Sequence, residues 1–321
     1  MRPFRIGSLY FLRRCSTHVQ DQILKQSLVV GLPIRVGHTL DAGRGVYAIR
    51  NIAHGELIHT ADPVVAHPSI ASLDKACYFC LKGLKRSVSY GRLPASEGSP
   101  TYCDRTCEES AQMLFYAAER QVDWSEFHDY CSTYGVRFPL IAKRLACMVA
   151  SSRTSPKSLD ILSHVDLSHG IPDNWITERK LLFKAISSKE ARGLNLEFLT
   201  DDWYAGVLAR LHINAFRIER IEEADSEDIL AAAAASIMGE SIVGSAVYIL
   251  PSMYNHNCDP NVDILWPSNA TANLVARRSI KSGEELHITY IDSSMSLDER
   301  RSFLEQHYGF TCRCARCRDG D

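Results

Sequence analysis

Apolar and polar residues alternate at both ends of this chain, which predicts short antiparallel strands there. Over residues 34–59, apolar positions alternate with polar residues or glycine, and glycines punctuate the run. The same strand pattern returns after residue 245 in four segments, Val247–Leu250, Val262–Leu265, Asn273–Ala276 and Leu286–Ile291. Residues 42–46, Ala-Gly-Arg-Gly-Val, are expected to form a glycine-flanked turn between two of the first strands.

Between these β-rich ends, the apolar residues follow helical spacing. Helices are predicted at Glu108–Asp123, Phe138–Val149, Glu178–Ile186 and Asp201–Phe216, and another near the C-terminus at Ser296–His307. Asp201 or Asp202 is the expected N-cap of the fourth helix. Ser296 and Glu299 have the spacing of a capping box at the start of the last one. The acidic and then alanine-rich stretch 222–240 receives no function.

Composition is that of an ordinary globular protein. The chain has 321 residues, of which 45% are apolar and 23% charged, enough for one large domain or two modest ones. The net charge of −2 gives no overall field that would attract the protein to nucleic acid or to an anionic membrane surface. No stretch approaches the ~18 consecutive apolar residues of a transmembrane helix.

The eleven cysteines are spaced for metal binding rather than for a disulfide scaffold. One group forms two close pairs: Cys77, Cys80, Cys103 and Cys107. A second lies within six residues of the C-terminal region: Cys312, Cys314 and Cys317. Such spacing favours zinc thiolates in a reducing compartment, although a single buried cysteine needs no metal. Three thiolates leave a zinc tetrahedron incomplete, so the second group needs a fourth ligand from elsewhere.

The N-terminus has the composition of a targeting segment. Residues 1–20 contain four arginines, several hydroxyl residues and no acidic residue, which is typical of an organellar transit peptide. The alternative is a frayed basic terminus that carries no targeting signal. We expect a mitochondrial location, with the nucleus as the alternative.

Three C-terminal motifs, in this order, resemble the second half of a SET domain and its post-SET loop. They are Asn255–Asn261 (NHNCDPN), Gly283–Tyr290 (GEELHITY) and Cys312–Cys317 (CRCARC). The glycines around Arg44 are similar to the G-x-G turn with which SET domains open. The residue after Asn-His is usually serine in the family and is Asn257 here.

The first cysteine group resembles the MYND finger of the SMYD group of SET proteins. The chain as a whole is also similar to the plant trithorax-related SET proteins. A full MYND finger has an interleaved second ligand set, but no cysteine lies between Cys80 and Cys103. His128 and Cys131 are similar to part of that set and lack two partners. One zinc ion, rather than two, is therefore expected in this insert.

The resemblance implies a SET fold of the α+β class, mainly β, with small antiparallel sheets around a threaded C-terminal segment. It places a SET domain at 34–292, after the transit peptide that composition leads us to expect at 1–20. A zinc insert at 74–110 and a helical insert at 136–240 would interrupt this domain. The post-SET segment would span 293–321.

The family resemblance also assigns functional residues. S-adenosylmethionine is the implied cofactor, and Tyr290 is the implied catalytic residue. The implied cofactor-binding residues are Arg44, Val46, Asn214, Asn255, His256, Tyr290 and Phe310. The implied lining of the substrate channel is Phe216, Tyr248 and Tyr254. Cys258 is the implied fourth ligand beside Cys312, Cys314 and Cys317, which gives two zinc sites in all.

The implied function is N-methylation of a lysine in a protein substrate, either a histone tail or an organellar protein, by a monomer. Methyl transfer to an amine requires a neutral lysine, whose ordinary pKa is ~10.4, so the channel has to disfavour the ammonium form. Partly desolvated aromatic walls do this. The alternative is a catalytically silent SET fold that binds protein partners through its zinc insert.

Overall fold

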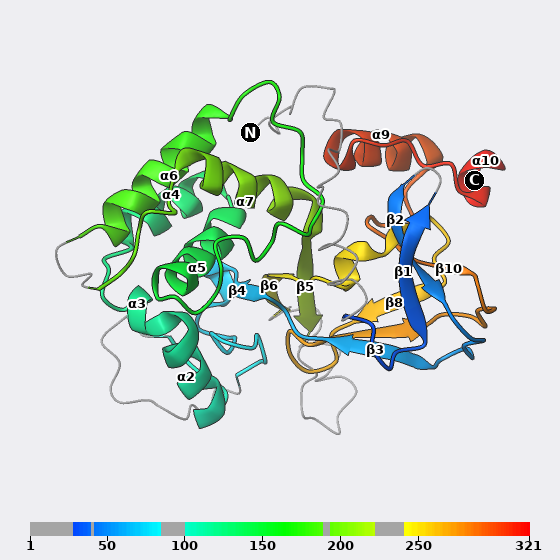
Figure 1. The fold of residues 1–321 in the computed structure, drawn as a ribbon, viewed down its shortest axis with the longest axis horizontal. Helices are drawn as coiled ribbons and strands as arrows, with labels where there is room; N and C mark the ends of the chain where they lie inside the picture. The colour runs from blue at the N-terminus through cyan, green and yellow to red at the C-terminus, as the bar shows by residue number, and fades with distance from the viewer. Residues whose placement is uncertain (1–27, 40–41, 85–99, 189–192, 222–240) are drawn as a thin grey trace, which may run out of the picture.

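The structure is a computed structural model that describes residues 28–39, 42–84, 100–188, 193–221 and 241–321. Figure 1 shows a helical end and a β-rich end, with one sheet between them. The segments 1–20 and 222–240, singled out in the sequence, lie outside the described residues. The described part has the small, mainly antiparallel sheets and the added helices that the sequence predicts.

Three small sheets make up the β structure of the described residues. The first has the order β1-β2-β10-β7, with bounds Ile34–Thr39, Gly43–Ala48, Glu285–Ile288 and Asn255–His256. The second has the order β3-β9-β8, with bounds Leu57–Ala61, Ala272–Ala276 and Val262–Leu265. The third has the order β4-β6-β5, with bounds Val65–Pro68, Ser241–Val247 and Ala215–Ile221.

Strand β10 connects the two ends of the sequence. Its Leu286 pairs antiparallel with Val46 of β2, and its Ile288 pairs in parallel with His256 of β7. Leu286, Ile288 and Val46 are all buried, so apolar burial and backbone pairing specify the same register. As a result, segments from both ends of the chain lie next to each other.

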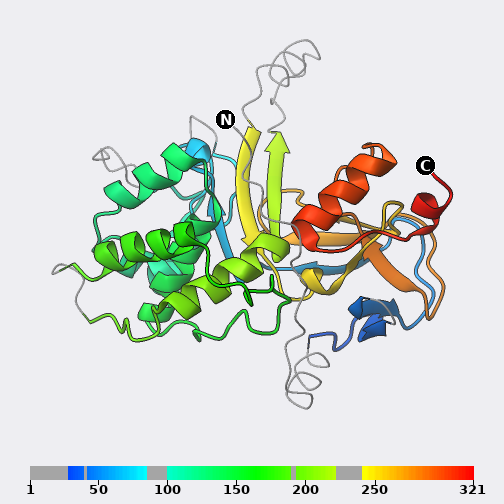
Figure 2. The same cartoon turned by 90° about the horizontal axis from the view of Figure 1, so that it is seen from above.

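The helices surround a second core, which is separate from the core of the sheets. Their bounds are α2 Arg105–Ala111, η2 Gln112–Tyr116, α3 Ala117–Glu119, α4 Ser125–Tyr134, α5 Phe138–Ala150, α6 Asp173–Ile186 and α7 Asp201–Asn214. The remaining bounds are η1 Ile70–Ser72, η3 Pro251–Met253, α9 Leu297–Tyr308 and α10 Ala315–Arg318. Figure 2 shows β5 and β6 between the helical end and α9. None of the helices in the described ranges combines the length and apolar character needed to span a bilayer.

Two expectations about strands are corrected by the structure. The strand expected at Val247–Leu250 keeps only its first residue, because β6 ends at Val247 and a turn at Ile249 and Leu250 leads into η3 at Pro251, whose fixed φ favours a turn. The turn expected at 42–46 is mostly strand. Gly43, with φ of 79°, leaves the turn, and the next residues pair with β1. The strand at Val262–Leu265 is confirmed.

Helix boundaries follow the local hydrogen bonds. Thr200, rather than Asp201 or Asp202, caps α7, because its hydroxyl accepts the N–H of Trp203 at 3.1 Å. The Asp201 carboxylate instead accepts a hydrogen bond from Arg179 at 2.6 Å. The capping box expected at the start of α9 is confirmed. The helix expected at 108–123 begins earlier, at α2, and passes through the π-helical turn η2.

Buried charges attach the cysteine-rich insert to the helical core. Lys143 and Arg144 of α5 lie with Nζ and Nε at 3.8 and 3.7 Å from Glu119 Oε1, and all three side chains are buried. The other oxygen of Glu119 accepts a hydrogen bond at 2.8 Å from the hydroxyl of Tyr78, which belongs to the insert. Removing one partner of such a network leaves an unpaired buried charge, at a cost of about 3–5 kcal/mol.

Glu178 of α6 is a buried carboxyl group whose hydrogen-bond partners are neutral. Its oxygens accept hydrogen bonds from the Tyr204 hydroxyl at 3.2 Å and from the Asn174 amide at 3.3 Å. Burial raises the pKa of Glu178 from 4.5 to about 7. Between these two values the folded protein holds a proton that the unfolded chain releases.

Glu178→Gln is expected to flatten the pH dependence of stability. The wild-type protein loses stability as the pH rises from about 4.5 through about 7, because the folded state has to release the more tightly held proton. The loss is on the order of 3 kcal/mol, at ~1.4 kcal/mol per pKa unit. Melting temperatures at about pH 5 and about pH 8 test this: the substitution should raise only the second value. Glu126→Gln, at an exposed carboxylate, is the control. An equal effect at both pH values would contradict the assignment.

Candidate active site and metal centres

A cavity of 1390 Å³ is lined by residues from both ends of the chain. Its walls come from β1, β2, the start of β5, β7, the segment after β10, helix α9 and the C-terminal tail. Small-molecule sites usually measure about 300–1,000 Å³. The cavity is therefore large enough for a cofactor together with a substrate side chain.

Most of the residues that the sequence assigns to the cofactor and the channel line this cavity. They are Arg44, Asn214, Phe216, Asn255, His256, Tyr290 and Phe310. Val46 is fully buried within β2. Tyr248 and Tyr254, expected in the channel wall, lie behind it instead. Both are fully buried, and their hydroxyls contact the Ala270 carbonyl and the His59 ring in the core.

Asn255 joins three strands at the cavity wall. Its side-chain amide donates to the Arg44 carbonyl at 2.6 Å and to Glu285 Oε1 at 2.7 Å. Arg44 thus contributes its main chain here, while its guanidinium donates to Ser163 Oγ at 3.0 Å. These bonds hold β2, β7 and β10 together where the cavity begins.

Gly45 allows this close approach. A Cβ atom at this position would lie 2.5 Å from Glu285 Oε1, 2.7 Å from Thr39 Cγ2 and 3.1 Å from Asn255 Nδ2. Any larger residue would displace the carboxylate that accepts from Asn255. The glycine is thus required by space rather than by its backbone angles.

Tyr290 is held by main-chain and ring contacts. Its hydroxyl donates to the Tyr254 carbonyl at 2.6 Å, and its N–H donates to His256 Nδ1 at 3.1 Å. Burial raises the pKa of Tyr290 above its ordinary value, so the phenol keeps its proton. Burial also lowers the pKa of His256 to about 4, so the imidazole is neutral and accepts the Tyr290 N–H. The rings of His256 and Phe310 lie with centroids 5.4 and 6.5 Å from the Tyr290 ring.

Trp266 and Tyr308 are among the cavity-lining aromatic residues that the sequence analysis does not single out. Trp266 follows β8 directly and lies 6.2 Å, centroid to centroid, from Phe216. Tyr308 ends α9 and lies 5.0 Å from the Tyr290 ring. Their positions at element ends, next to predicted motifs, are the only sequence signal that could have indicated them.

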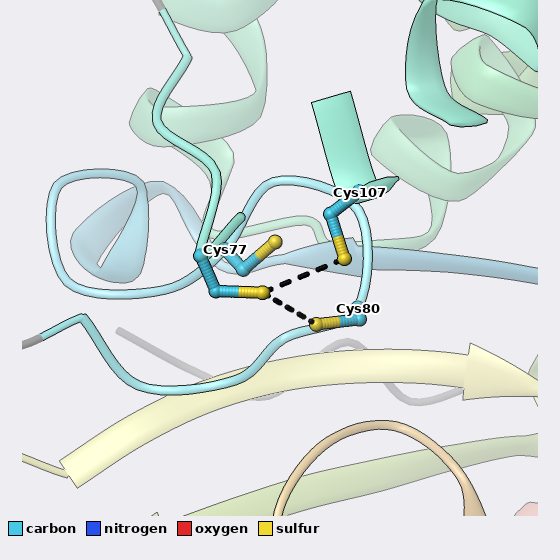
Figure 3. A group of neighbouring side chains, drawn as sticks. Cys77, Cys80 and Cys107 are labelled. Atoms are coloured by element: carbon cyan, nitrogen blue, oxygen red, sulfur yellow. Dashed lines mark hydrogen bonds between the residues drawn. The ribbon is translucent and has the colours of Figure 1, made fainter. Parts of the chain in front are cut away.

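The first cysteine group brings its four thiols together: Cys77, Cys80, Cys103 and Cys107. Figure 3 shows the thiols of Cys77, Cys80 and Cys107 pointing toward one another. Leu81, with φ of 61°, turns the chain after the first pair. Asp104 caps α2 by accepting the N–H of Cys107 at 2.8 Å, which positions the second pair.

The second group joins the loop after β7 to the C-terminal tail: Cys258, Cys312, Cys314 and Cys317. Its thiols also lie within 4.8 Å of one another. His256, two residues before Cys258, places Nε2 at 3.3 Å from the Cys258 sulfur. The buried Arg300 of α9 lies 4.0 Å from the Cys317 sulfur and donates to the Met295 carbonyl at 2.6 Å.

Sulfur spacing in both groups fits tetrahedral zinc. Zinc–sulfur bonds of about 2.3 Å place the sulfurs of a tetrahedron about 3.8 Å apart. The sulfurs of Cys80 and Cys103 are 3.6 Å apart, and those of Cys258 and Cys312 are 3.9 Å apart. A disulfide would require about 2.05 Å. Both groups thus have the ligand number, type and spacing of structural zinc sites.

His128 and Cys131 do not join the first group. The His128 ring lies 3.3 Å from Lys143 Nζ, and Cys131 is buried in the helical core. Among the described residues, the insert contains one group with ligand spacing. This agrees with a single zinc ion in the insert.

Cys258→Ser and Cys314→Ser are each expected to remove about one zinc ion per chain, because three thiolates do not close the tetrahedron. Cofactor affinity should fall as well, since the same centre ties Phe310 to the cavity. Metal analysis and calorimetric titration with S-adenosylhomocysteine measure the two effects. Cys131→Ala, outside both groups, is the control and should retain full zinc. Undiminished zinc content and affinity in the two serine variants would refute the coupling.

Comparison with known proteins places the chain in a family. The family model described as "SET domain" matches residues 43–291, which include every described strand except β1, helices α2 to α7 and most of the residues that line the cavity. The histone-lysine N-methyltransferase ATXR4 of Arabidopsis thaliana is 45% identical over 289 residues, or 90% of this chain and 87% of that protein.

Other relatives are more distant. A SET and MYND domain-containing protein of Dictyostelium discoideum is 28% identical over 81% of this chain and 76% of its own length. A crystal structure of the SET domain of LSMT bound to lysine and AdoHcy is 14% identical, with a TM-score of 0.40. The match covers 92% of this chain and 58% of that one. On the strength of the family model and the first relative, the chain belongs to the SET-domain family.

Proposed function

We propose that this protein is an S-adenosylmethionine-dependent protein-lysine N-methyltransferase. The observation that carries the proposal is the placement of Tyr290, whose hydroxyl is held beside the Asn255-His256 segment in a cavity built from both ends of the domain. Membership of the SET family and the printed name of the ATXR4 relative support it.

The residues that would hold the cofactor are those at the β2, β7 and tail side of the cavity. S-adenosylmethionine, when bound, would supply a sulfonium methyl group, to whose carbon a neutral amine can bond as the carbon–sulfur bond breaks and S-adenosylhomocysteine leaves. Asn255 and the main chain around Arg44 offer amide and carbonyl groups for its polar parts, while His256, whose ring nitrogens contact Tyr290 and Cys258, contributes the wall of the cavity. Phe310 offers an aromatic face, 6.1 Å from the His256 ring by centroid, for a flat base.

Tyr290 acts by position rather than as a base. Its raised pKa keeps the phenol protonated, and its proton is donated to the Tyr254 carbonyl. The lone pairs of the phenol oxygen thus remain able to accept weak C–H···O and N–H···O contacts from a cationic methyl group and an amine. Preorganised acceptors of this kind favour charge that is shared during transfer.

The apolar walls of the channel would favour the neutral form of the substrate lysine. Phe216 and Trp266 present apolar surface to the cavity, and their rings lie 6.2 Å apart. Surroundings of this type exclude water and disfavour an ammonium group, which lowers the pKa of a lysine that enters. The walls thereby favour the neutral amine that attack on a methyl group requires.

The second cysteine group would keep the tail in place. Cys312 lies two residues after Phe310, and Cys258 lies two residues after His256, so one zinc ion would hold both cavity walls. Zinc binding and pocket assembly would then be linked. The first group would stabilise the insert and leave the cavity untouched, because its cysteines do not line it.

We further infer that the substrate is a lysine-bearing protein, either a histone or an organellar protein, and that the enzyme acts as a monomer. The near-neutral net charge supports neither nucleic-acid nor membrane-surface binding. The arginine-rich, acid-free residues 1–20 favour a mitochondrial protein, with the nucleus as the alternative.

Tyr290→Phe tests the methyl-transfer proposal. Purified protein and labelled S-adenosylmethionine should transfer label to protein lysines, identified by mass spectrometry. The variant should lose on the order of 10²-fold in rate, because positioning of the reacting groups is lost, with cofactor affinity within a few fold of wild type. Tyr204→Phe, in the helical insert, is the matched control. A wild-type protein that binds cofactor but labels no lysine would favour the silent scaffold.

A fluorescent fusion tests the location. The full chain should accumulate in mitochondria, and a chain lacking residues 1–20 should not, because the basic segment carries the address. Arg13 and Arg14 changed together to glutamate give a full-length control with the charge pattern destroyed. Nuclear signal from both chains would overturn the mitochondrial proposal.

A further inference from the structure

The side chain and the main-chain carbonyl of Tyr254 contact different parts of the molecule. Its side chain is fully buried among the core residues of the sheets, whereas its main-chain carbonyl accepts the hydroxyl of Tyr290 at 2.6 Å. The next two residues, Asn255 and His256, form β7 and contact Arg44, Glu285 and Tyr290. The orientation of Tyr254 therefore determines where the acceptor for the catalytic phenol lies.

The Tyr254 side chain has a directional partner in the core. Its hydroxyl lies 2.9 Å from His59 Nε2, and the other nitrogen of that ring lies 3.1 Å from the Thr60 carbonyl. A carbonyl only accepts, so Nδ1 of His59 carries the proton and Nε2 is the acceptor. Tyr254 therefore donates to His59. Burial lowers the pKa of His59, which keeps the imidazole in this neutral form.

The backbone places His59 for this contact. His59 lies on β3, where the pairing with β9 shifts register between Leu57 and His59. An irregularity of this type re-aims the following side chain. His59 is 5% exposed and its ring lies 5.9 Å from the Tyr254 ring by centroid. The second sheet is thereby connected to the start of β7.

We propose that Tyr254 and His59 are positioning residues for Tyr290, joined by the hydrogen bond from the Tyr254 hydroxyl to His59. The hydrogen bond fixes the Tyr254 ring, the ring fixes the peptide that follows it, and the carbonyl of that peptide holds the phenol of Tyr290. The inference rests on the proposed methyl transfer and gives Tyr254 a role different from that of channel lining.

An apolar residue at position 254 would fill the same space, but it would have no hydrogen bond to fix the orientation of its side chain. A buried hydroxyl and a buried imidazole each cost free energy unless they are paired, and here they pair with each other. Removal of the Tyr254 hydroxyl leaves His59 Nε2 without its donor. The ring then loses the contact that sets its angle, while its apolar packing remains.

The experiment compares Tyr254→Phe with Tyr204→Phe, a second fully buried tyrosine whose hydroxyl bonds to Glu178 in the helical insert. Both variants lose a buried hydrogen bond, so both should lose similar stability. Only Tyr254→Phe should slow single-turnover methyl transfer, by ~10-fold or more, with the dissociation constant of S-adenosylhomocysteine within about twofold of wild type. Equal rates for the two variants would overturn the proposal.

A double substitution separates positioning from general packing. In the Tyr290→Phe background the phenol is absent, so Tyr254→Phe should cause no further loss of rate. A loss that multiplies with that of Tyr290→Phe would mean that Tyr254 acts independently of the phenol, and the proposal would be wrong.

Spectroscopy tests the same contact without turnover. The Cζ signal of Tyr290 in carbon-13 tyrosine-labelled protein, assigned with Tyr290→Phe, should shift in Tyr254→Phe and stay in place in Tyr204→Phe. An unmoved Tyr290 signal overturns the inference even if the protein transfers methyl groups. If the wild type transfers none, the proposed function fails, and this measurement still decides the positioning role.

Substitutions of His59 test the same hydrogen bond if the Tyr254→Phe variant does not fold. In His59→Gln the amide oxygen can replace Nε2 as acceptor, so the Tyr290 signal and the transfer rate should stay near wild type. His59→Leu removes the acceptor and should reproduce the slow rate and the shifted signal. Wild-type behaviour of His59→Leu in both measurements would refute the proposal.

Discussion

The pairing of β10 with β2 on one side and β7 on the other is the constraint on which the site depends. This four-residue strand lies between two segments separated by about 200 residues of sequence, and the Asn255 amide bonds to the Arg44 carbonyl across that separation. The close contact requires Gly45, because a side chain there would overlap the Glu285 carboxylate. Without this pairing the parts of the cavity wall that come from β2, β7 and β10 would not meet.

Two metal centres would secure the parts of the molecule that have little core of their own. The tail after α9 packs in a small cluster of its own, and its cysteines reach back to Cys258. The cysteine group brings the two ends of the insert together, and Tyr78 attaches the insert to the helical half through its hydrogen bond to the buried Glu119. Ion pairs of this kind are weak sources of stability but costly to break, so they favour one docking position for the insert.

His256 links these elements at the centre of the cavity. Its Nδ1 accepts the N–H of Tyr290, and its Nε2 lies beside the Cys258 sulfur. One neutral imidazole thus contacts both the phenol that would act in transfer and a ligand of the second centre. Metal-site geometry and the position of Tyr290 are therefore coupled through one side chain.

Sequence motifs were sufficient to identify the residues whose roles depend on local spacing. The close cysteine pairs act through neighbours in sequence, so their chemistry is readable without coordinates. The Asn-His and Gly-Glu-Glu motifs are recognisable as patterns, but Asn255 acts through Arg44 and Glu285, which only the fold brings next to it. The capping box of α9 was readable for the same reason as the cysteine pairs, since both partners lie within one turn. The N-cap of α7 was not, because Asp201 is engaged by Arg179 of another helix.

Tertiary structure alone decided which way each aromatic side chain faces. Tyr248 and Tyr254 are aromatic residues of the type expected in a channel wall. Hydrogen bonds to the Ala270 carbonyl and to His59 hold their side chains in the core instead. Trp266 and Tyr308, without a motif of their own, line the cavity because β8 and α9 end there. The sequence determines which aromatic side chains are present. Long-range packing and hydrogen bonding determine whether each side chain points into the core or into the cavity.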